Sequence, residues 1–146
     1  MEAKELRLRD WVFLVDIEDY GEVISVSGDE TVQLLVGDKT YIRQTIHVGP
    51  IPLTEEILLK NGFIKDSYTN LSYDYVHFDN GPDKTGIYIN LRGTCDKNKE
   101  IYVLNKDTGL DAQLVFDRIK TQNKNLYVHQ LQHLLSEVES KKEIEL

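Results

Sequence analysis

Residues 50–63 constrain the fold most, because they encode a complete short helix together with both of its ends. Thr54 is placed to be the N-cap, where its hydroxyl would accept a backbone N–H of the first turn. Glu55 and Glu56 follow in that turn, where the helix dipole favours negative charge. Gly62 stands after the last turn and tolerates the positive φ with which many helices end. We therefore predict a short helix between Thr54 and Gly62.

Before this helix, four short β-rich runs alternate with turns made of Gly, Asp, Ser and Lys. The runs are residues 11–15, 22–26, 31–36 and 40–43. This close spacing predicts an antiparallel meander that curls into a small barrel. An opening strand that ends near a loop, followed by a strand led by glycine, resembles an SH3-like or KOW-like barrel. We therefore expect residues 1–53 to form an SH3-like β-barrel unit.

After the helix, residues 72–78, 87–92 and 101–104 are predicted to be strands. Residues 110–120 fit either a strand face or a helical stripe, and the Asp-Thr-Gly turn before them favours a strand. Apolar residues at helical spacing predict a C-terminal helix at about residues 127–139. We expect this helix to pack on an aliphatic sheet face, made of Ile87, Ile89, Leu91, Ile101 and Val103.

The predicted fold class is therefore α+β. It consists of an N-terminal SH3-like small β-barrel, a short helix, an antiparallel sheet and a C-terminal helix. Residues 54–146 would form an α+β unit packed against the barrel, or one domain continuous with it. A chain of 146 residues is long enough to bury a core of this kind.

Three separated stretches of the chain resemble one family. They are residues 8–12, residues 51–63 and residues 127–132. Together they are similar to small uncharacterised proteins carried by phages and mobile elements of gut Bacteroidales, and the similarity spans most of the chain with a variable middle. Arg9 and residues 133–136 depart from the family pattern. The resemblance implies no activity.

Composition excludes several classes of protein. Cys95 is the only cysteine, so an intramolecular disulfide and a multi-cysteine zinc site are excluded. No apolar run approaches the roughly 20 residues that span a bilayer. The first residues lack the apolar core of a signal peptide, so we expect a cytoplasmic protein that is not bound to a membrane.

Candidate metal and catalytic residues are few. His129 and His133 lie four residues apart and would share a helix face, but zinc needs three or four ligands. Asp16, Glu18 and Asp19 could hold a hard cation, but they lack the spacing of a calcium loop. No nucleophile elbow and no Gly-rich phosphate loop is present. The sequence therefore predicts no enzyme, no metal site and no cofactor.

Tyrosines on two of the predicted strands form the feature that rises above background. Tyr73, Tyr75 and His77 share one face of their strand, because side chains alternate across a strand. Tyr88 and Arg92 share a face of the next strand, opposite its aliphatic residues. Tyr and Arg are enriched at binding hot spots, so these five residues are the predicted partner-binding site. The alternative is that the rings cover the sheet or pack under the C-terminal helix.

Two functions follow from these patterns. The favoured one is a non-catalytic protein-interaction module of a phage or mobile element, which binds an unidentified protein through the tyrosine face or a barrel edge. The alternative is a nucleic-acid-binding barrel with five residues near its rim: Arg7, Arg9, Lys39, Tyr41 and Arg43. Residues 1–53 contain ten acidic side chains and five basic ones, so binding to nucleic acid is not expected.

Overall fold

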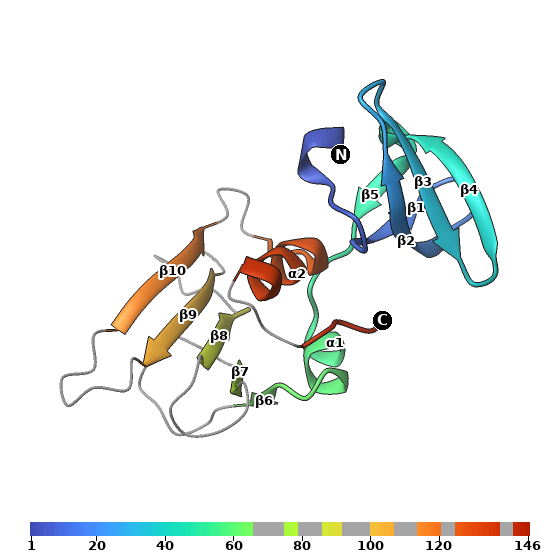
Figure 1. Cartoon of the computed structure of the whole chain (residues 1–146). Coiled ribbons are helices and arrows are strands. Elements are labelled where there is room, and N and C mark those ends of the chain that lie inside the picture. Colours follow the sequence, from blue (N-terminus) through green and yellow to red (C-terminus); the bar gives the residue numbers. More distant parts are fainter. Residues whose placement is uncertain (66–74, 79–85, 92–99, 107–113, 121–124, 138–141) are drawn as a thin grey trace. The chain divides into compact units, whose positions relative to one another are not determined.

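A computed structural model describes residues 1–65, 75–78, 86–91, 100–106, 114–120, 125–137 and 142–146. The chain has an α+β fold with two five-stranded antiparallel sheets and a C-terminal helix (Figure 1). It divides into two compact units. Unit 1 comprises Met1–Pro52 and Tyr127–His133, and unit 2 comprises Leu53–Leu126 and Leu134–Leu146.

Unit 1 contains the N-terminal sheet. Its elements are η1 (Ala3–Glu5), β1 (Trp11–Leu14), β2 (Asp19–Val26), β3 (Thr31–Val36), β4 (Lys39–Gln44), η2 (Thr45–His47) and β5 (Val48–Pro50). The strand order is β4-β3-β2-β1-β5, so the first four strands form a meander and β5 returns to pair with β1. The four predicted strands are confirmed, whereas β5 and the two 3₁₀ turns were not predicted.

This sheet is curled. In a flat sheet β4 would lie three strand spacings, about 14 Å, from β1. Nevertheless Arg43 on β4 donates to Asp16, just after β1, at 2.8 Å. Val15 N–H donates to the carbonyl of His47 at 3.0 Å, which fixes the end of β1 against η2. A β-bulge between Val23 and Ser25 adds to the bend in β2.

The curled sheet remains open. Within residues 1–65, the edge strands β4 and β5 pair only with β3 and β1, respectively. β5 is three residues long and ends at Pro50, and proline has no N–H with which to extend a ladder. The expected barrel is therefore present as an open, curled antiparallel sheet. Seven buried apolar residues fill its inner side: Leu6, Val12, Leu14, Val23, Val32, Leu34 and Val48.

The predicted short helix is confirmed as α1 (Glu55–Lys60) in unit 2. Thr54 Oγ1 accepts the Ile57 N–H at 3.3 Å, as expected of an N-cap. At the other end Gly62 has a φ of 78°. Phe63 N–H donates to the carbonyl of Leu58, and Gly62 N–H donates to that of Leu59. These two bonds form a Schellman motif, and the glycine at position 62 adopts its positive φ without a steric penalty.

Unit 2 contains the second sheet of the chain, with the strand order β10-β9-β8-β7-β6. Its strands are β6 (Ile64–Lys65), β7 (Tyr75–Phe78), β8 (Gly86–Asn90), β9 (Glu100–Lys106) and β10 (Leu114–Lys120). β10 confirms that residues 114–120 are a strand and not a helix. Strands β7, β8 and β9 match predicted runs, whereas the two-residue β6 was not predicted.

The C-terminal helix is α2 (Val128–Glu137). Its predicted apolar stripe is buried at Val128, Leu131, Leu134 and Leu135, and Val138 lies outside the described residues. The expected packing of this helix on the aliphatic face of the second sheet stays a prediction. None of the helices in the described ranges is long and apolar enough to cross a membrane.

Candidate functional site

The expected shared face of Tyr75 and Tyr88 is wrong, and the role of these residues in partner binding stays a prediction. Tyr75 is only 3% exposed, and it is buried beside Ile89, its partner across the β7–β8 pair. Tyr88 pairs with Val76, and this pair is adjacent to the Tyr75–Ile89 pair. Residues opposite each other in an antiparallel pair share a face, so Tyr75 and Tyr88 occupy positions on opposite faces.

The error has a clear physical source. The period of two predicts which residues of one strand share a face, but it does not fix the register between strands, and a slip of one residue exchanges the faces. His77 is half-buried, and its ring lies 5.2 Å from that of Phe63. Tyr73 and Arg92 lie outside the described residues.

The outer face of the N-terminal sheet is a more exposed candidate. Strand register places Trp11, Glu22, Leu35 and Thr40 in one row across β1 to β4. Phe13 and Tyr20 form the adjacent row on β1 and β2. Ser25, Gln33 and Ile42 form a third row on the other side. All three rows face away from the buried core residues, which occupy the alternate positions.

Five of these residues form a diagonal apolar stripe, which we call the outer stripe: Trp11, Phe13, Tyr20, Leu35 and Ile42. Leu35 pairs with Glu22, two residues from Tyr20, and with Thr40, two residues from Ile42. Tyr20 and Ile42 are therefore diagonal neighbours of Leu35 on the adjacent strands, at a distance that large side chains can span. The rings of Phe13 and Tyr20 are in contact, with centroids 5.6 Å apart. Tyr20 is 48% exposed and Ile42 63%, whereas Trp11, Phe13 and Leu35 are half-buried, so the stripe is open to solvent mainly at Tyr20 and Ile42.

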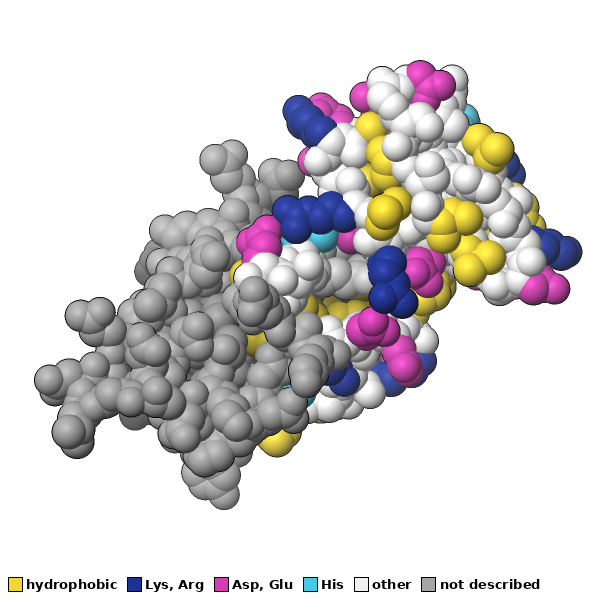
Figure 2. Space-filling model, in the orientation of Figure 1, with side chains coloured by type: hydrophobic (Ala, Val, Ile, Leu, Met, Phe, Trp, Pro, Cys, Tyr) yellow, Lys and Arg dark blue, Asp and Glu magenta, His cyan; other side chains and the backbone are white. Residues whose placement is uncertain are grey.

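Hydrophobic side chains are visible on the surface of this sheet in Figure 2. A monomer does expose single apolar residues, but a connected row of them across four strands is less ordinary. The sequence did contain a signal for this second apolar face. Residues 11–14 are apolar without interruption, although one side of an antiparallel sheet usually faces water and is polar.

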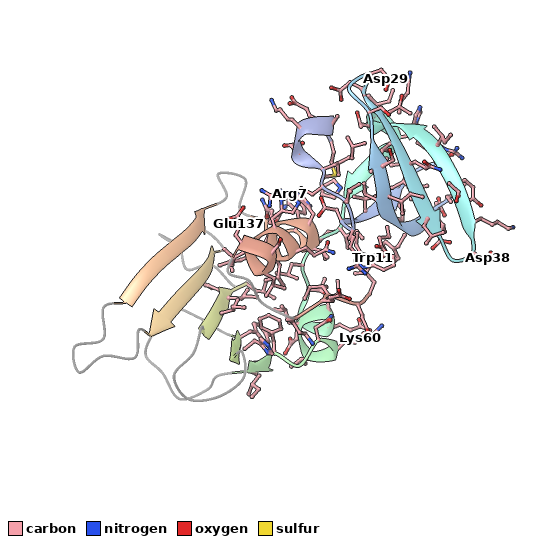
Figure 3. The ribbon with its side chains drawn as sticks, viewed as in Figure 1. Arg7, Trp11, Asp29, Asp38, Lys60 and Glu137 are labelled. Carbon is pink, nitrogen blue, oxygen red and sulfur yellow. The ribbon has the colours of Figure 1, made fainter. Side chains whose placement is uncertain are left out.

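The charged side chains beside the outer stripe are mostly acidic, although the exposed Lys39 lies next to Asp38. Glu22 is the only charged residue among the three rows, and Arg9 pairs with it at 3.4 Å. Exposed acidic side chains lie nearby, at Glu18 between β1 and β2, at Asp19 at the start of β2 and at Asp38 between β3 and β4. Figure 3 shows Asp38 at one end of the sheet and Asp29 at the other. The stripe therefore offers apolar contact within an acidic border.

The free edge of the sheet is less suited to binding than its face. Arg43 Nη1 donates to the carbonyl of Ile42 at 2.8 Å, which occupies a main-chain acceptor of β4. Charged side chains on an edge strand are a common protection against pairing with another strand. Strand addition at β4 would have to displace Arg43 from Asp16 as well.

The basic residues of the nucleic-acid alternative are largely occupied within unit 1. Arg9 is paired with Glu22, and Arg43 with Asp16. The Arg43 guanidinium also lies over the Tyr41 ring, 5.3 Å from its centroid. Phosphate binding needs Lys and Arg that can replace counterions, and these arginines already face carboxylates.

The start of β1 is fixed by residues of α2 that belong to the same unit. Gln132 Oε1 accepts the Trp11 N–H at 2.9 Å, and Gln132 Nε2 donates to the carbonyl of Arg9 at 2.8 Å. His133 Nε2 donates to Asp10, with 2.8 and 2.9 Å to its two carboxylate oxygens. These bonds hold the end of the outer stripe that contains Trp11.

Asp10 is nearly fully buried, and its carboxylate also accepts the Arg7 N–H at 2.7 Å. Buried carboxylates are stable when every lone pair has a donor, and these contacts supply donors from both sides. No hydroxyl or thiol in the described part of the chain is hydrogen-bonded to His133. The Asp10–His133 pair therefore lacks a visible nucleophile and connects two segments of unit 1.

His129 lies beside this pair. It is 8% exposed, its ring stacks on Tyr127, and its centroid lies 5.7 Å from that of His133. Among the residues that the structure describes, none is a hydrogen-bond partner of its Nδ1 atom. Burial lowers the pKa of His129, with Asp10 opposing that effect and His133 adding to it. Burial therefore favours the neutral form of His129.

The predicted metal candidates can now be placed. His129 and His133 share a face of α2, but no group of three or more His, Cys, Asp or Glu residues among those described could hold an ion. In the acidic loop, Asp16 is bound to Arg43 and Asp19 accepts the Tyr20 N–H. No protein-family model, curated protein or solved structure matches the chain.

Proposed function

We propose that unit 1 is a non-catalytic protein-interaction module that binds its partner on the outer stripe. The observation behind this proposal is a set of apolar residues at outward positions of four strands, with Phe13 and Tyr20 in ring contact and Tyr20 and Ile42 about half or more exposed. Aromatic side chains supply much of the binding energy at protein interfaces, because they bury a large area and lose little conformational entropy.

The border of the stripe indicates the chemistry of the partner. Asp19 and Asp38 lie beside the apolar side chains, Glu22 is paired with Arg9, and the three rows contain no Lys or Arg. Complementary charge speeds encounter and excludes like-charged partners. The partner surface is therefore apolar at its centre and basic at its rim.

We further propose that unit 1 is an SH3-like barrel in its chain topology. Three features support this: the strand order β4-β3-β2-β1-β5, the bulged eight-residue β2, and the 3₁₀ turn η2 between β4 and β5. β2 pairs with β1 through its first half and with β3 through its second half. Such a shared strand lets a short sheet bend around one core.

A pair of isoleucine variants tests the proposed function. Ile42→Ser removes an apolar side chain from the outer stripe. Ile46→Ser makes the same chemical change at a residue in η2 that is 75% exposed and lies outside the three rows. Immobilised parent protein and both variants are incubated with an extract of the native cells, and bound proteins are compared.

We expect a basic protein that is retained by the parent and by Ile46→Ser and lost from Ile42→Ser. Removing one exposed isoleucine from an interface should weaken binding roughly tenfold to a hundredfold, since burial of its side chain contributes roughly 1.5–3 kcal/mol and each 1.4 kcal/mol is a factor of about ten. If both variants retain the same set of proteins, or the parent retains none, the proposal is wrong.

The nucleic-acid alternative is tested with the same samples. We expect no retention on a DNA or RNA column at 50 mM salt, because the nearby arginines are paired with carboxylates. Retention that disappears at moderate salt would favour the alternative.

A further inference from the structure

Asn61, at the end of α1, hydrogen-bonds the backbone of a segment more than eighty residues away. Its Oδ1 accepts the Glu145 N–H at 2.9 Å, and its Nδ2 donates to the Glu145 carbonyl at 2.7 Å. Nδ2 also donates to the Ile57 carbonyl at 2.8 Å, which orients the amide. The side chain is 3% exposed. Both residues belong to unit 2.

A carboxamide has the same donor and acceptor as a peptide group. Asn61 therefore pairs with one residue of residues 142–146, the tail segment, as a neighbouring strand would. Such main-chain hydrogen bonds contribute affinity whatever the side chain of the bound residue is. Pockets for the side chains of adjacent residues of the peptide contribute specificity.

The adjacent side chain is Ile144, which is 4% exposed, whereas Glu143 and Glu145 on either side of it are exposed. The Lys60 ammonium donates to the carbonyl of Leu146. The tail segment is thus held by one buried aliphatic side chain and by main-chain bonds at Glu145 and Leu146.

From this we infer that the C-terminal end of α1, with Asn61 at its centre, is a peptide-binding site that the chain itself fills with its tail segment. Its ligand class is an extended peptide with an aliphatic residue followed by a residue of any type. The occupant that the structure favours in trans is the tail segment of a second copy. This site is in unit 2 and is independent of the outer stripe in unit 1.

The test uses the full chain with Ile144→Asp, which disfavours burial of its own tail segment, because an unpaired buried carboxylate is costly. The probe is the acetylated and amidated peptide Lys-Glu-Ile-Glu-Leu with a fluorescent label. We expect saturable binding to Ile144→Asp that is at least tenfold tighter than binding to the parent chain. Adding Asn61→Ala to Ile144→Asp should weaken it at least tenfold.

A peptide with Asp in place of its Ile is the matched control ligand, and it should bind at least tenfold more weakly. Equal binding of the two peptides would overturn the proposal, and so would absence of binding to a folded Ile144→Asp chain.

If Ile144→Asp does not fold, the parent chain is labelled with ¹⁵N and titrated with unlabelled peptide. The peptide concentration must exceed the mM effective concentration of a tethered segment. The Glu145 amide resonance should then move to the position of a free peptide, and an unchanged resonance would overturn the proposal.

Discussion

At the scale of single residues, polar side chains that bind backbone groups define much of this structure. Thr54 caps α1, Asn61 binds the tail segment, and Gln132 binds the backbone on either side of Asp10. The role of Thr54 could be predicted, because a cap acts on a backbone group three residues away. The roles of Asn61 and Gln132 could not, since their partners lie 84 and more than 120 residues away.

The cap on α1 gives a direct stability prediction. Thr54→Ala removes the acceptor of the Ile57 N–H and should lower the free energy of unfolding by about 1 kcal/mol. Thr54→Ser keeps the hydroxyl and should lose much less. Urea unfolding of the three proteins measures this, and an equal loss in both variants would show that the hydroxyl is not the stabilising group.

His129 gives a prediction for pH. Burial lowers the pKa of His129 in the folded chain, whereas the pKa of a histidine in an unfolded chain is about 6.5. As the pH falls below this value, the unfolded state binds the proton first, so stability falls. The contribution of His129 to the free energy of unfolding is therefore fully present above pH 7, and it decreases as the pH falls through the acidic range.

His129→Phe removes this titration and should reduce the loss of unfolding free energy between pH 7 and pH 5. His47→Gln, at an exposed histidine, is the matched control and should leave that loss almost unchanged. Denaturant titrations at the two pH values provide the measurement. A His129→Phe protein that loses as much stability as the parent would contradict the assignment.

At the scale of elements, hydrophobic periodicity predicted the longer helices and strands well. The exceptions were β5 and β6, which have three and two residues and are too short to show a period. Register was a separate failure, because it depends on turns and bulges that periodicity does not describe. The Tyr75–Ile89 pairing therefore reversed the expected face. The candidate site was missed for the same reason, since the outer stripe becomes connected only once four strands are aligned.

The curl of the N-terminal sheet depends on a close approach at Gly21. A Cβ atom there would lie 3.0 Å from Leu14 Cδ1 and 3.0 Å from Val36 Cγ2. Gly21→Val should therefore cost about 1–3 kcal/mol through overpacking of the inner side. Gly28→Val is the control, because a Cβ at Gly28 would have no atom within 4 Å. Similar melting temperatures for the two variants would mean that the inner side has room to expand.

At the scale of the whole molecule, the chain combines two units with separate candidate surfaces. The outer stripe lies in unit 1, and the site of the tail segment lies in unit 2. The net charge of the chain is −8. Residues 1–53 contain ten acidic and five basic residues, so more than half of this negative charge comes from them. This distribution favours a basic protein partner for unit 1 and opposes contact with phosphate backbones.

The central claim, that the outer stripe is a contact surface, is tested most directly by site-specific photo-cross-linking. A photoreactive amino acid is placed at Ile42 in one sample and at Ile46 in another, and both are irradiated in native cells. The two positions are both well exposed, and only Ile42 belongs to the outer stripe. We predict a discrete cross-linked adduct from position 42 and none from position 46. The absence of an adduct at position 42, or the same adduct from both positions, would contradict the claim.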